Sequence, residues 1–420
     1  MVQLITFLLL LVFAWSFIKG FSVERFLVAT FVVNLAIDLV QFDEISSLVA
    51  ALRAAYFYFF FAYFYLKYGI RRIDAPIMIL LLYVLVGVLL SSDVAHSFRF
   101  MLRVFVPFFL FSITTRVKNP IEVLSRLRIY LPVFLVVVVL YTVASNYFRF
   151  GVSTYGSSIF LTGYLFGADL HLFSFIIIIT LTTRAIVGEK EVKIKWYEIL
   201  FSILTLITLM FTLRRTSLAI VLAGVVFLNV TSFKAVIKRF VPLGILLFLV
   251  GYGVFNNPFF QQRILARENK FSVESLEDEA RYHEIEVIYK EVLMFRDPMD
   301  SFFGKELFNS MGNYGDGKFK DRMIHVDYFT WLHGGGVVGL MLYLFFLFSI
   351  PLMLRVPFFT TDMSNAYLRL FWFLWFIQFI ISVSGQMYII SFRGFIFIYL
   401  ALTAGAYHQE KRIRYEGSVC

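Results

Sequence analysis

Two adjacent arginines stand out among the residues that could do chemistry, because they interrupt an apolar stretch of membrane-spanning character. The stretch reads Met210-Phe-Thr-Leu-Arg-Arg-Thr-Ser-Leu-Ala-Ile220, with Arg214 and Arg215 at its centre. A charged side chain in or beside hydrocarbon is costly, so an arginine there marks a site for an anion or a functional partner. A guanidinium presents a rigid fork of donors that fits phosphate oxygens. The pair therefore predicts a phosphate-binding site.

A histidine supplies the second candidate group, at the entrance to a later apolar run. The segment is Met323-Ile-His-Val-Asp-Tyr-Phe-Thr-Trp-Leu-His-Gly-Gly-Gly-Val-Val-Gly339, so His325 comes just before the run. Histidine can give or take a proton near neutral pH. His333 follows eight residues later, and a continuous helix would put it on the same face. The glycines after it allow a backbone or ligand to approach closely, and small residues also serve helix packing in membranes.

The composition indicates the class of protein that must position these groups. Of the 420 residues, 60% are hydrophobic and 16% are charged, whereas a soluble domain is about half apolar and about a quarter charged. The formal net charge of +10 sits in short loops between apolar runs, where membrane orientation explains it better than nucleic-acid binding. The single cysteine, Cys420, excludes a disulfide framework and a cysteine-ligated metal site.

The hydrophobic pattern predicts an all-α, polytopic transmembrane protein of about thirteen helices. Residues 1–255 hold ten expected spans and residues 325–420 hold three more with a tail, and we expect the first to be retained and not removed as a signal peptide. The expected spans are 2–18, 26–42, 48–66, 75–91, 99–115, 129–147, 159–182, 195–213, 216–231, 237–255, 325–350, 366–384 and 387–407.

Lysine and arginine collect in alternate loops, which the positive-inside rule assigns to the cytoplasm. The C-terminal tail is then cytoplasmic, and the turn at Arg214 and Arg215 faces outward, against the rule. The basic groups are Lys67/Arg71/Arg72, Arg116/Lys118/Arg126/Arg128, Arg184/Lys190/Lys193/Lys195, Lys234/Lys238/Arg239, Arg355/Arg369 and Lys411/Arg412/Arg414.

The longest polar segment, 256–324, is also expected outside. Its apolar residues predict a helix at 280–295, followed by an irregular stretch from Gly304 to Gly317. A loop of this length with structure of its own is usually functional.

The order of these features resembles the O-antigen ligase and O-antigen polymerase (Wzy-type) superfamily of bacterial membrane glycosyltransferases. Residues 151–169 are similar to the family's loop that leads into a helix, and Arg215 matches its helix-start arginine. Arg281, a helix, Pro298 and Gly304 resemble the large outer loop. His325 with the downstream Gly336-Val-Val-Gly339 matches the family's histidine and its G-x-x-G.

One position departs from the family pattern. The family often has asparagine directly after the histidine, and this chain has Val326. A hydrogen bond made by that asparagine must then be absent or come from another side chain, such as Asp327.

The resemblance implies transfer of a glycan from an undecaprenyl-pyrophosphate carrier to a sugar hydroxyl, on the periplasmic side of the bacterial inner membrane. Arg215 would stabilise the pyrophosphate leaving group, with Arg214 and Arg281 in support, and His325 would be the general base of an inverting displacement. Further contacts with pyrophosphate or glycan are expected from Asp327, His333 and Arg393. We expect no metal and no cofactor. A chain-length regulator and a flippase of the same pathway are expected partners, besides membrane lipids.

Each candidate also has a structural interpretation. Arg214 and Arg215 would suit snorkelling to lipid phosphates, and His325 and His333 could be ordinary interfacial or packing residues. The structural alternatives for the remaining groups are pairing of Arg281 with Glu284 or Glu286, pairing of Arg393 with a carboxylate, a structural contact at Asp169 and His171, and a helix–helix contact at Asn34 and Asp38.

Two other functions compete with a polymerase. A ligase would use the same donor but pass the polymer to a lipid A core, and the departure at Val326 favours the polymerase. A flippase for the lipid-linked glycan would also need arginines in a cavity. The chain shows no repeat symmetry of the kind common in transporters, and its candidate residues lie on one side of the expected membrane.

Overall fold

The structure is a computed structural model in which only part of the chain is described. The described residues are 22–39, 46–151, 160–165, 167–186, 195–212, 215–229, 252, 261, 280–311, 313–315, 323–324, 326–358, 365–385 and 387–419. Three site candidates in helices, Asp169, Arg215 and Arg281, are described in their backbone only. The expected span 2–18 lies outside the described residues, and so does 237–255 apart from residue 252. Arg214 and His325 also lie outside them.

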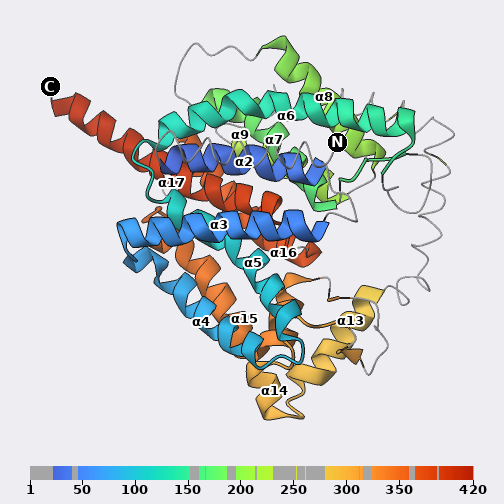
Figure 1. Cartoon of the computed structure of the whole chain (residues 1–420). Coiled ribbons are helices and arrows are strands. Elements are labelled where there is room, and N and C mark those ends of the chain that lie inside the picture. Colours follow the sequence, from blue (N-terminus) through green and yellow to red (C-terminus); the bar gives the residue numbers. More distant parts are fainter. Residues whose placement is uncertain are drawn as a thin grey trace.

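The regular structure of the described residues is helical, apart from two isolated β-bridges. One joins Gly151 to Gly163 and the other joins Thr162 to Tyr164. Each expected span that lies in the described part contains a helix, and Figure 1 shows their arrangement. The α-helices are α2 (Val23–Leu39), α3 (Ser46–Tyr68), α4 (Ala75–Leu89), α5 (Val94–Thr114), α6 (Pro120–Phe148), α7 (Gly167–Ile186), α8 (Trp196–Phe211), α9 (Arg215–Asn229), α13 (Ala280–Ile288), α14 (Pro298–Phe303), α15 (Asp327–Met353), α16 (Ala366–Ser384) and α17 (Ile390–Val419).

Six helical segments of the described part are long and apolar enough to cross a membrane, as a polytopic membrane protein requires. They correspond to α4, α5, α6, α15, α16 and α17. Polar caps help to start several helices in this part of the chain. The Asp93 carboxylate accepts a hydrogen bond from the His96 backbone NH at 2.9 Å, and Asn365 caps α16 in the same way.

The helix α17 forms the centre of the bundle. In its most apolar eighteen-residue stretch 94% of the residues are buried, compared with 28% in the stretch that includes α4. It packs against α2, α5, α6, α7 and α16. Glycines permit close contact there, because a Cβ on Gly405 would come within 2.8 Å of Pro120 at the start of α6. In a membrane, α17 is therefore shielded by protein while α4 is left to face lipid.

Turns rich in basic residues meet at one end of the helices. Arg116, just after α5, forms a buried ion pair with Asp74 at 2.8 Å and donates to the Gly69 carbonyl oxygen. At the same end, the Asn365 amide donates to Glu410 of α17 at 2.7 Å. In the described part of the chain, polar contacts thus join the turn before α4 to the turn after α5, and the start of α16 to α17.

The opposite end carries α13 and α14, as Figure 1 shows at the lower right, far from the C-terminus. The loop after α14 is tied to the turn between α4 and α5. Glu306 accepts hydrogen bonds from the Ser91 hydroxyl at 2.8 Å and the Ser92 backbone NH at 3.2 Å. Charged loop residues are therefore fixed at the end of apolar helices.

Three element boundaries differ from expectation. The helix expected from residue 159 begins at Gly167, because Gly163 takes a φ of 62° and the chain before it forms bridges. The helix expected at 280–295 is α13 followed by a π-helix, η3 (Tyr289–Leu293). The span expected from residue 325 is α15, which is kinked at Gly336, where φ is 61°.

Candidate functional site

A buried ion pair joins the starts of α15 and α17. Arg393 donates through Nη2 to Oδ2 of Asp327, and each side chain is only 2% exposed. The other carboxylate oxygen accepts from the Met387 backbone NH at 3.0 Å, and Arg393 Nη1 donates to the Ser382 hydroxyl at 3.4 Å. A buried pair with further hydrogen bonds avoids leaving an uncompensated charge. Arg393 is thus paired with a carboxylate, the structural alternative named for it above.

Aromatic side chains of α15 pack beside this ion pair. The Tyr343 hydroxyl lies 3.2 Å from the Ser382 hydroxyl, and the Tyr343 ring stacks on Trp331 with 5.0 Å between centroids. Tyr328 donates to the Phe379 carbonyl oxygen at 2.9 Å. These contacts hold the first turns of α15 against α16.

A second set of contacts connects the start of α9 to the same place. His171 of α7 and Ser217 of α9 are 2.7 Å apart, from Nδ1 to Oγ, and both are buried. The His171 ring also packs on Phe392, with 5.6 Å between centroids. Phe392 precedes Arg393, and Ser217 lies two residues after Arg215. These contacts link the start of α9 to the residue before Arg393, and His171 makes a structural contact.

The chain on both sides of His325 is buried, although His325 itself is not described. Ile324 packs with Ile288, Val292, Tyr314 and Leu332 in a small hydrophobic cluster. Its backbone NH donates to the Ser310 hydroxyl at 3.2 Å. Val326 is also buried, and the next residue is Asp327. Ile324 is thus held by the outer loop, and Asp327 is held by the ion pair.

His333 lies in a separate polar cluster under the outer loop. Its side chain is fully buried, with Nε2 3.3 Å from Oε2 of Glu291, and neither ring nitrogen makes a hydrogen bond of good geometry among the described residues. Glu291 accepts from the Gly315 backbone NH at 2.7 Å and lies 3.4 Å from Nζ of Lys305. A carboxylate that faces an imidazole can orient its ring.

The surroundings of Glu291 favour its charged form. Burial raises the pKa of its carboxyl group, but the contacts with His333, the Gly315 NH and Lys305 outweigh burial and lower the pKa to about 2. Glu291 was not singled out from the sequence, because a glutamate on an expected loop helix looks like any solvated charge. Trp331, Tyr343 and Ser382 were not singled out either, because no sequence motif marks their positions.

The remaining sequence candidates are distributed around these clusters. Arg281 lies in α13, on the outer loop, and Asp169 lies in α7 one turn before Phe173. Glu284, one of the two expected partners of Arg281, is buried and accepts a hydrogen bond from the Tyr314 hydroxyl at 3.4 Å. The structure thus brings Asp327 and Arg393 together and puts His333 with a different carboxylate.

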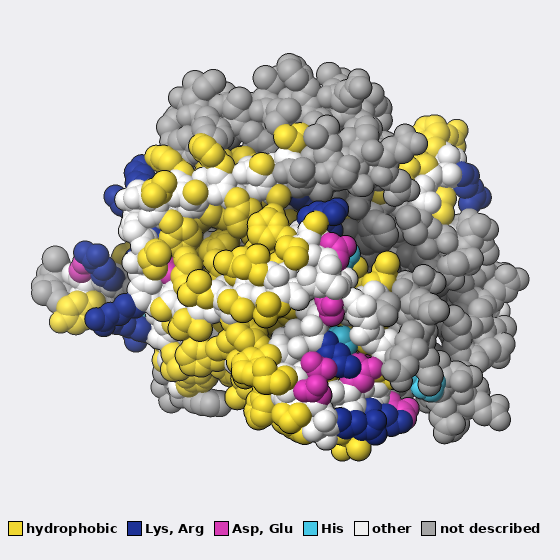
Figure 2. Space-filling model, turned by 60° about the horizontal axis from the view of Figure 1, so that its bottom comes forward, with side chains coloured by type: hydrophobic (Ala, Val, Ile, Leu, Met, Phe, Trp, Pro, Cys, Tyr) yellow, Lys and Arg dark blue, Asp and Glu magenta, His cyan; other side chains and the backbone are white. Residues whose placement is uncertain are grey.

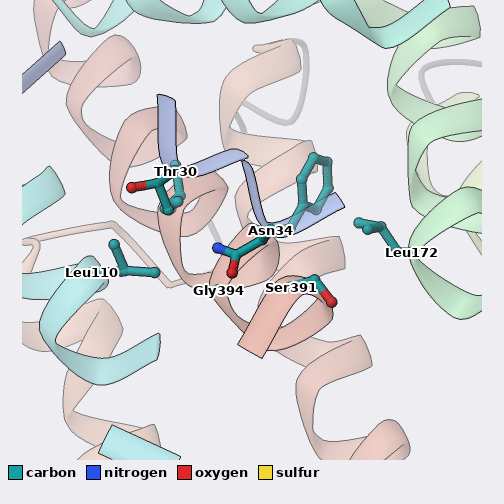
Figure 3. Close-up of a pocket in the computed structure, with 8 residues that line it drawn as sticks. Thr30, Asn34, Leu110, Leu172, Ser391 and Gly394 are labelled. Atoms are coloured by element: carbon teal, nitrogen blue, oxygen red, sulfur yellow. The ribbon is translucent and has the colours of Figure 1, made fainter. Parts of the chain in front are cut away.

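A small cavity with a mostly apolar lining lies between α2, α5, α7 and α17 (Figure 3). Oγ1 of Thr30, Oδ1 of Asn34 and Oγ of Ser391 line it, and none of these atoms has a hydrogen-bond partner among the described residues. Its volume of about 10 Å³ is close to the minimum for one water molecule. It is therefore too small for a sugar or a pyrophosphate. Asn34 lines this cavity, and the Asp38 side chain is not described.

Comparison with known proteins adds no relative. No protein-family model matches the chain, and no curated protein matches it. Its function must therefore be inferred from residue types, their order along the chain and their geometry.

Proposed function

We propose that the protein is a membrane glycosyltransferase that takes its glycan from a polyprenyl-pyrophosphate carrier, and in particular a surface-polysaccharide polymerase. The acceptor would be the sugar hydroxyl of a second lipid-linked repeat unit. The end of the bundle that carries α13 and α14 would face the periplasm, because the basic turns gather at the other end. The order of candidate residues along the chain resembles that of the O-antigen polymerase and ligase superfamily.

One observation supports the proposal: a chain of side-chain contacts links the start of α9 to the buried ion pair between α15 and α17. From Ser217 the contacts run through His171 and Phe392 to Arg393. Arg393 then binds Asp327, two residues after His325. Ser217 and Asp327, which lie two residues after Arg215 and two residues after His325, are thereby linked through the same few side chains. Such convergence is what a shared substrate would require.

The proposed reaction is a single displacement at the anomeric carbon. The acceptor oxygen forms a bond to this carbon as its bond to the pyrophosphate oxygen breaks, and the carrier pyrophosphate leaves with both electrons of that bond. His325 takes the proton of the acceptor hydroxyl. Arg215, at the first position of α9, stabilises the charge that develops on the leaving group, with help from the partial positive charge of the helix N-terminus.

Asp327 and Arg393 would act as positioning residues in this proposal. Their mutual ion pair fixes the segment that carries His325. Arg393 would not itself neutralise the pyrophosphate, because that would leave Asp327 buried without its partner. This revises the direct substrate contact expected for both residues from the sequence.

The proposal is tested with purified protein in vesicles and an undecaprenyl-pyrophosphate oligosaccharide. Donor alone should yield longer lipid-linked glycan and free undecaprenyl pyrophosphate. Addition of lipid A core distinguishes a ligase, which would give polymer only on that acceptor. Movement of intact substrate across the vesicle membrane without carrier release would instead show a flippase and would refute glycosyl transfer.

A further inference from the structure

The outer-loop helix α14 presents large apolar side chains on its surface. Met299 is 67% exposed and Phe303 is 53% exposed, and Phe302 is similarly open. Beside them, Leu293, Met294 and Phe295 at the end of η3 are also exposed. A cluster of this size on a water-exposed loop would be unfavourable, so it indicates contact with a membrane or another molecule.

These side chains are held in place by a rigid backbone. Gly304, which ends α14, has a φ of 82°, and a Cβ there would lie 2.3 Å from the backbone of Gly334 in α15. A Cβ on Gly336 would lie equally close to the backbone of Phe302. The Ser301 hydroxyl donates to the Val292 carbonyl oxygen at 2.6 Å. The helix therefore cannot turn its aromatic side chains inward without losing this packing.

The contacts of α14 with the membrane-spanning helix α4 show how deep α14 lies in the membrane. This depth identifies what covers its exposed apolar side chains. The Tyr83 hydroxyl donates to the Gly335 carbonyl oxygen at 2.5 Å and lies 3.3 Å from the Phe303 carbonyl oxygen. Tyr83 precedes the end of the apolar run at Leu90 by seven residues, or about 10 Å at the rise of an α-helix. The side chains of a helix lean toward its N-terminus, which for α4 is the end away from α14. The Tyr83 hydroxyl is therefore at least as far from the C-terminal end of α4 as the Tyr83 backbone is.

A second contact agrees with this depth. A Cβ on Gly87 of α4 would lie 3.2 Å from Leu307, so the chain just after α14 packs below the end of α4. The exposed face of α4 at this level consists of Leu82, Val86 and Leu89. Figure 2 shows the hydrophobic surface continuing to the lower edge of the molecule, next to a group of charged side chains.

We propose that α14 is an interfacial helix that sits in the outer leaflet, with Met299, Phe302 and Phe303 in contact with phospholipid. Because α14 lies at the same depth as the lipid-facing residues of α4, the same apolar surroundings must cover the exposed side chains of both helices. Aromatic residues are favoured at the boundary between headgroups and acyl chains. The nearby exposed Arg296 is suited to bind lipid phosphates. The anchor would keep the outer loop at the membrane surface whether or not the protein transfers glycans.

Site-specific fluorescence tests the location of α14. Cys420 is the only cysteine, so Cys420→Ser gives a background in which Met299→Cys or Phe303→Cys carries the sole label. Both positions are exposed, so the label replaces no buried packing. A matched control is Glu286→Cys, on α13 in the same loop, whose side chain is 56% exposed. Each protein is placed in single-copy lipid nanodiscs that contain spin-labelled phosphatidylcholine, and aqueous iodide is the opposing quencher.

The expected result is that spin-labelled lipid quenches the labels at Met299 and Phe303 several-fold more than the label at Glu286, with the reverse order for iodide. If iodide reaches Met299 and Phe303 as readily as Glu286, and lipid quenches none of them, the lipid contact is refuted. Single-copy discs make this outcome distinct from burial by a second copy. Neither result depends on glycosyl transfer.

Discussion

At the scale of single residues, the charges inside the bundle are neutralised by partners far away in the sequence. Asp327 and Arg393 were both recognisable as candidates, and pairing of Arg393 with a carboxylate was one of two interpretations. Which carboxylate it binds could not be predicted, because 66 residues separate them and helix adjacency is not encoded in local pattern. Glu291 was not recognisable at all, since its importance comes from its proximity to buried His333.

Removal of one member of the buried pair should be more harmful than removal of both. Asp327→Asn or Arg393→Gln leaves an uncompensated buried charge, which costs about 3–5 kcal/mol of unfolding free energy. The double variant should recover a large part of this loss, because no lone charge remains. Unfolding of the four proteins of this cycle in detergent measures the coupling. Simple addition of the two single losses would show that the residues do not interact.

The pH dependence of stability should reveal Glu291. Its pKa in the folded protein is about 2, below the ordinary value of 4.5. The stability from its contacts is therefore complete above pH 4.5 and is lost as the pH falls from 4.5 toward 2. Glu291→Gln should be less stable than wild type at neutral pH and should lack this loss. Thermal unfolding temperatures across the range provide the measurement, and parallel curves for the two proteins would contradict the assignment.

At the scale of elements, the helices could be predicted and their interruptions could not. Hydrophobic runs locate the spans, because each must be apolar for its whole length. The glycines after His333 indicated a close approach of backbone or ligand, and the structure places the backbone of α14 there. A glycine shows that close approach is possible, but its partner depends on where a distant loop returns. The kink at Gly336 likewise depends on the returning loop, because the backbone of Phe302 lies against this glycine.

Gly304 offers a direct test of the packing between α14 and α15. Gly304→Ala places a methyl group against the backbone of Gly334, in addition to the cost of a positive φ. Gly69→Ala is the matched control, because Gly69 has a φ of 70° and nothing within 4 Å of its Cβ position. Both substitutions should lower the free energy of unfolding by about 1–3 kcal/mol through strained backbone. Only Gly304→Ala should lower the unfolding temperature further and expose the outer loop to protease. Equal effects would mean that the close contact is unimportant.

At the scale of the whole molecule, composition predicts a membrane protein but not its interior. The central α17 and the lipid-facing α4 are both apolar, because lipid and protein interior are equally apolar surroundings. Hydropathy therefore cannot distinguish them, and only the structure identifies α17 as the core. The basic loops were predicted to share one side of the membrane, which stays a prediction. Among the described turns, Arg116 pairs with Asp74, and Asn365 binds Glu410 of α17.

Cysteine labelling in whole cells tests the proposed orientation. In the Cys420→Ser background, Arg296→Cys should react with a membrane-impermeant maleimide once the outer membrane is opened. Arg72→Cys and Lys118→Cys, which are exposed at the basic end, should react only after the inner membrane is permeabilised. The opposite pattern would place the proposed site in the cytoplasm and would exclude a periplasmic transfer.

The most direct test of the central claim is the rate of carrier release by four variants in vesicles. His325→Ala should slow the release of undecaprenyl pyrophosphate by about 10²–10⁴-fold, the usual contribution of a general base, and Arg215→Ala should also nearly abolish it. Arg215→Lys would restore little, because a point charge lacks the guanidinium fork. The control His283→Ala, at an exposed loop position, should release carrier at the wild-type rate. Wild-type release by folded His325→Ala or Arg215→Ala protein would contradict the account.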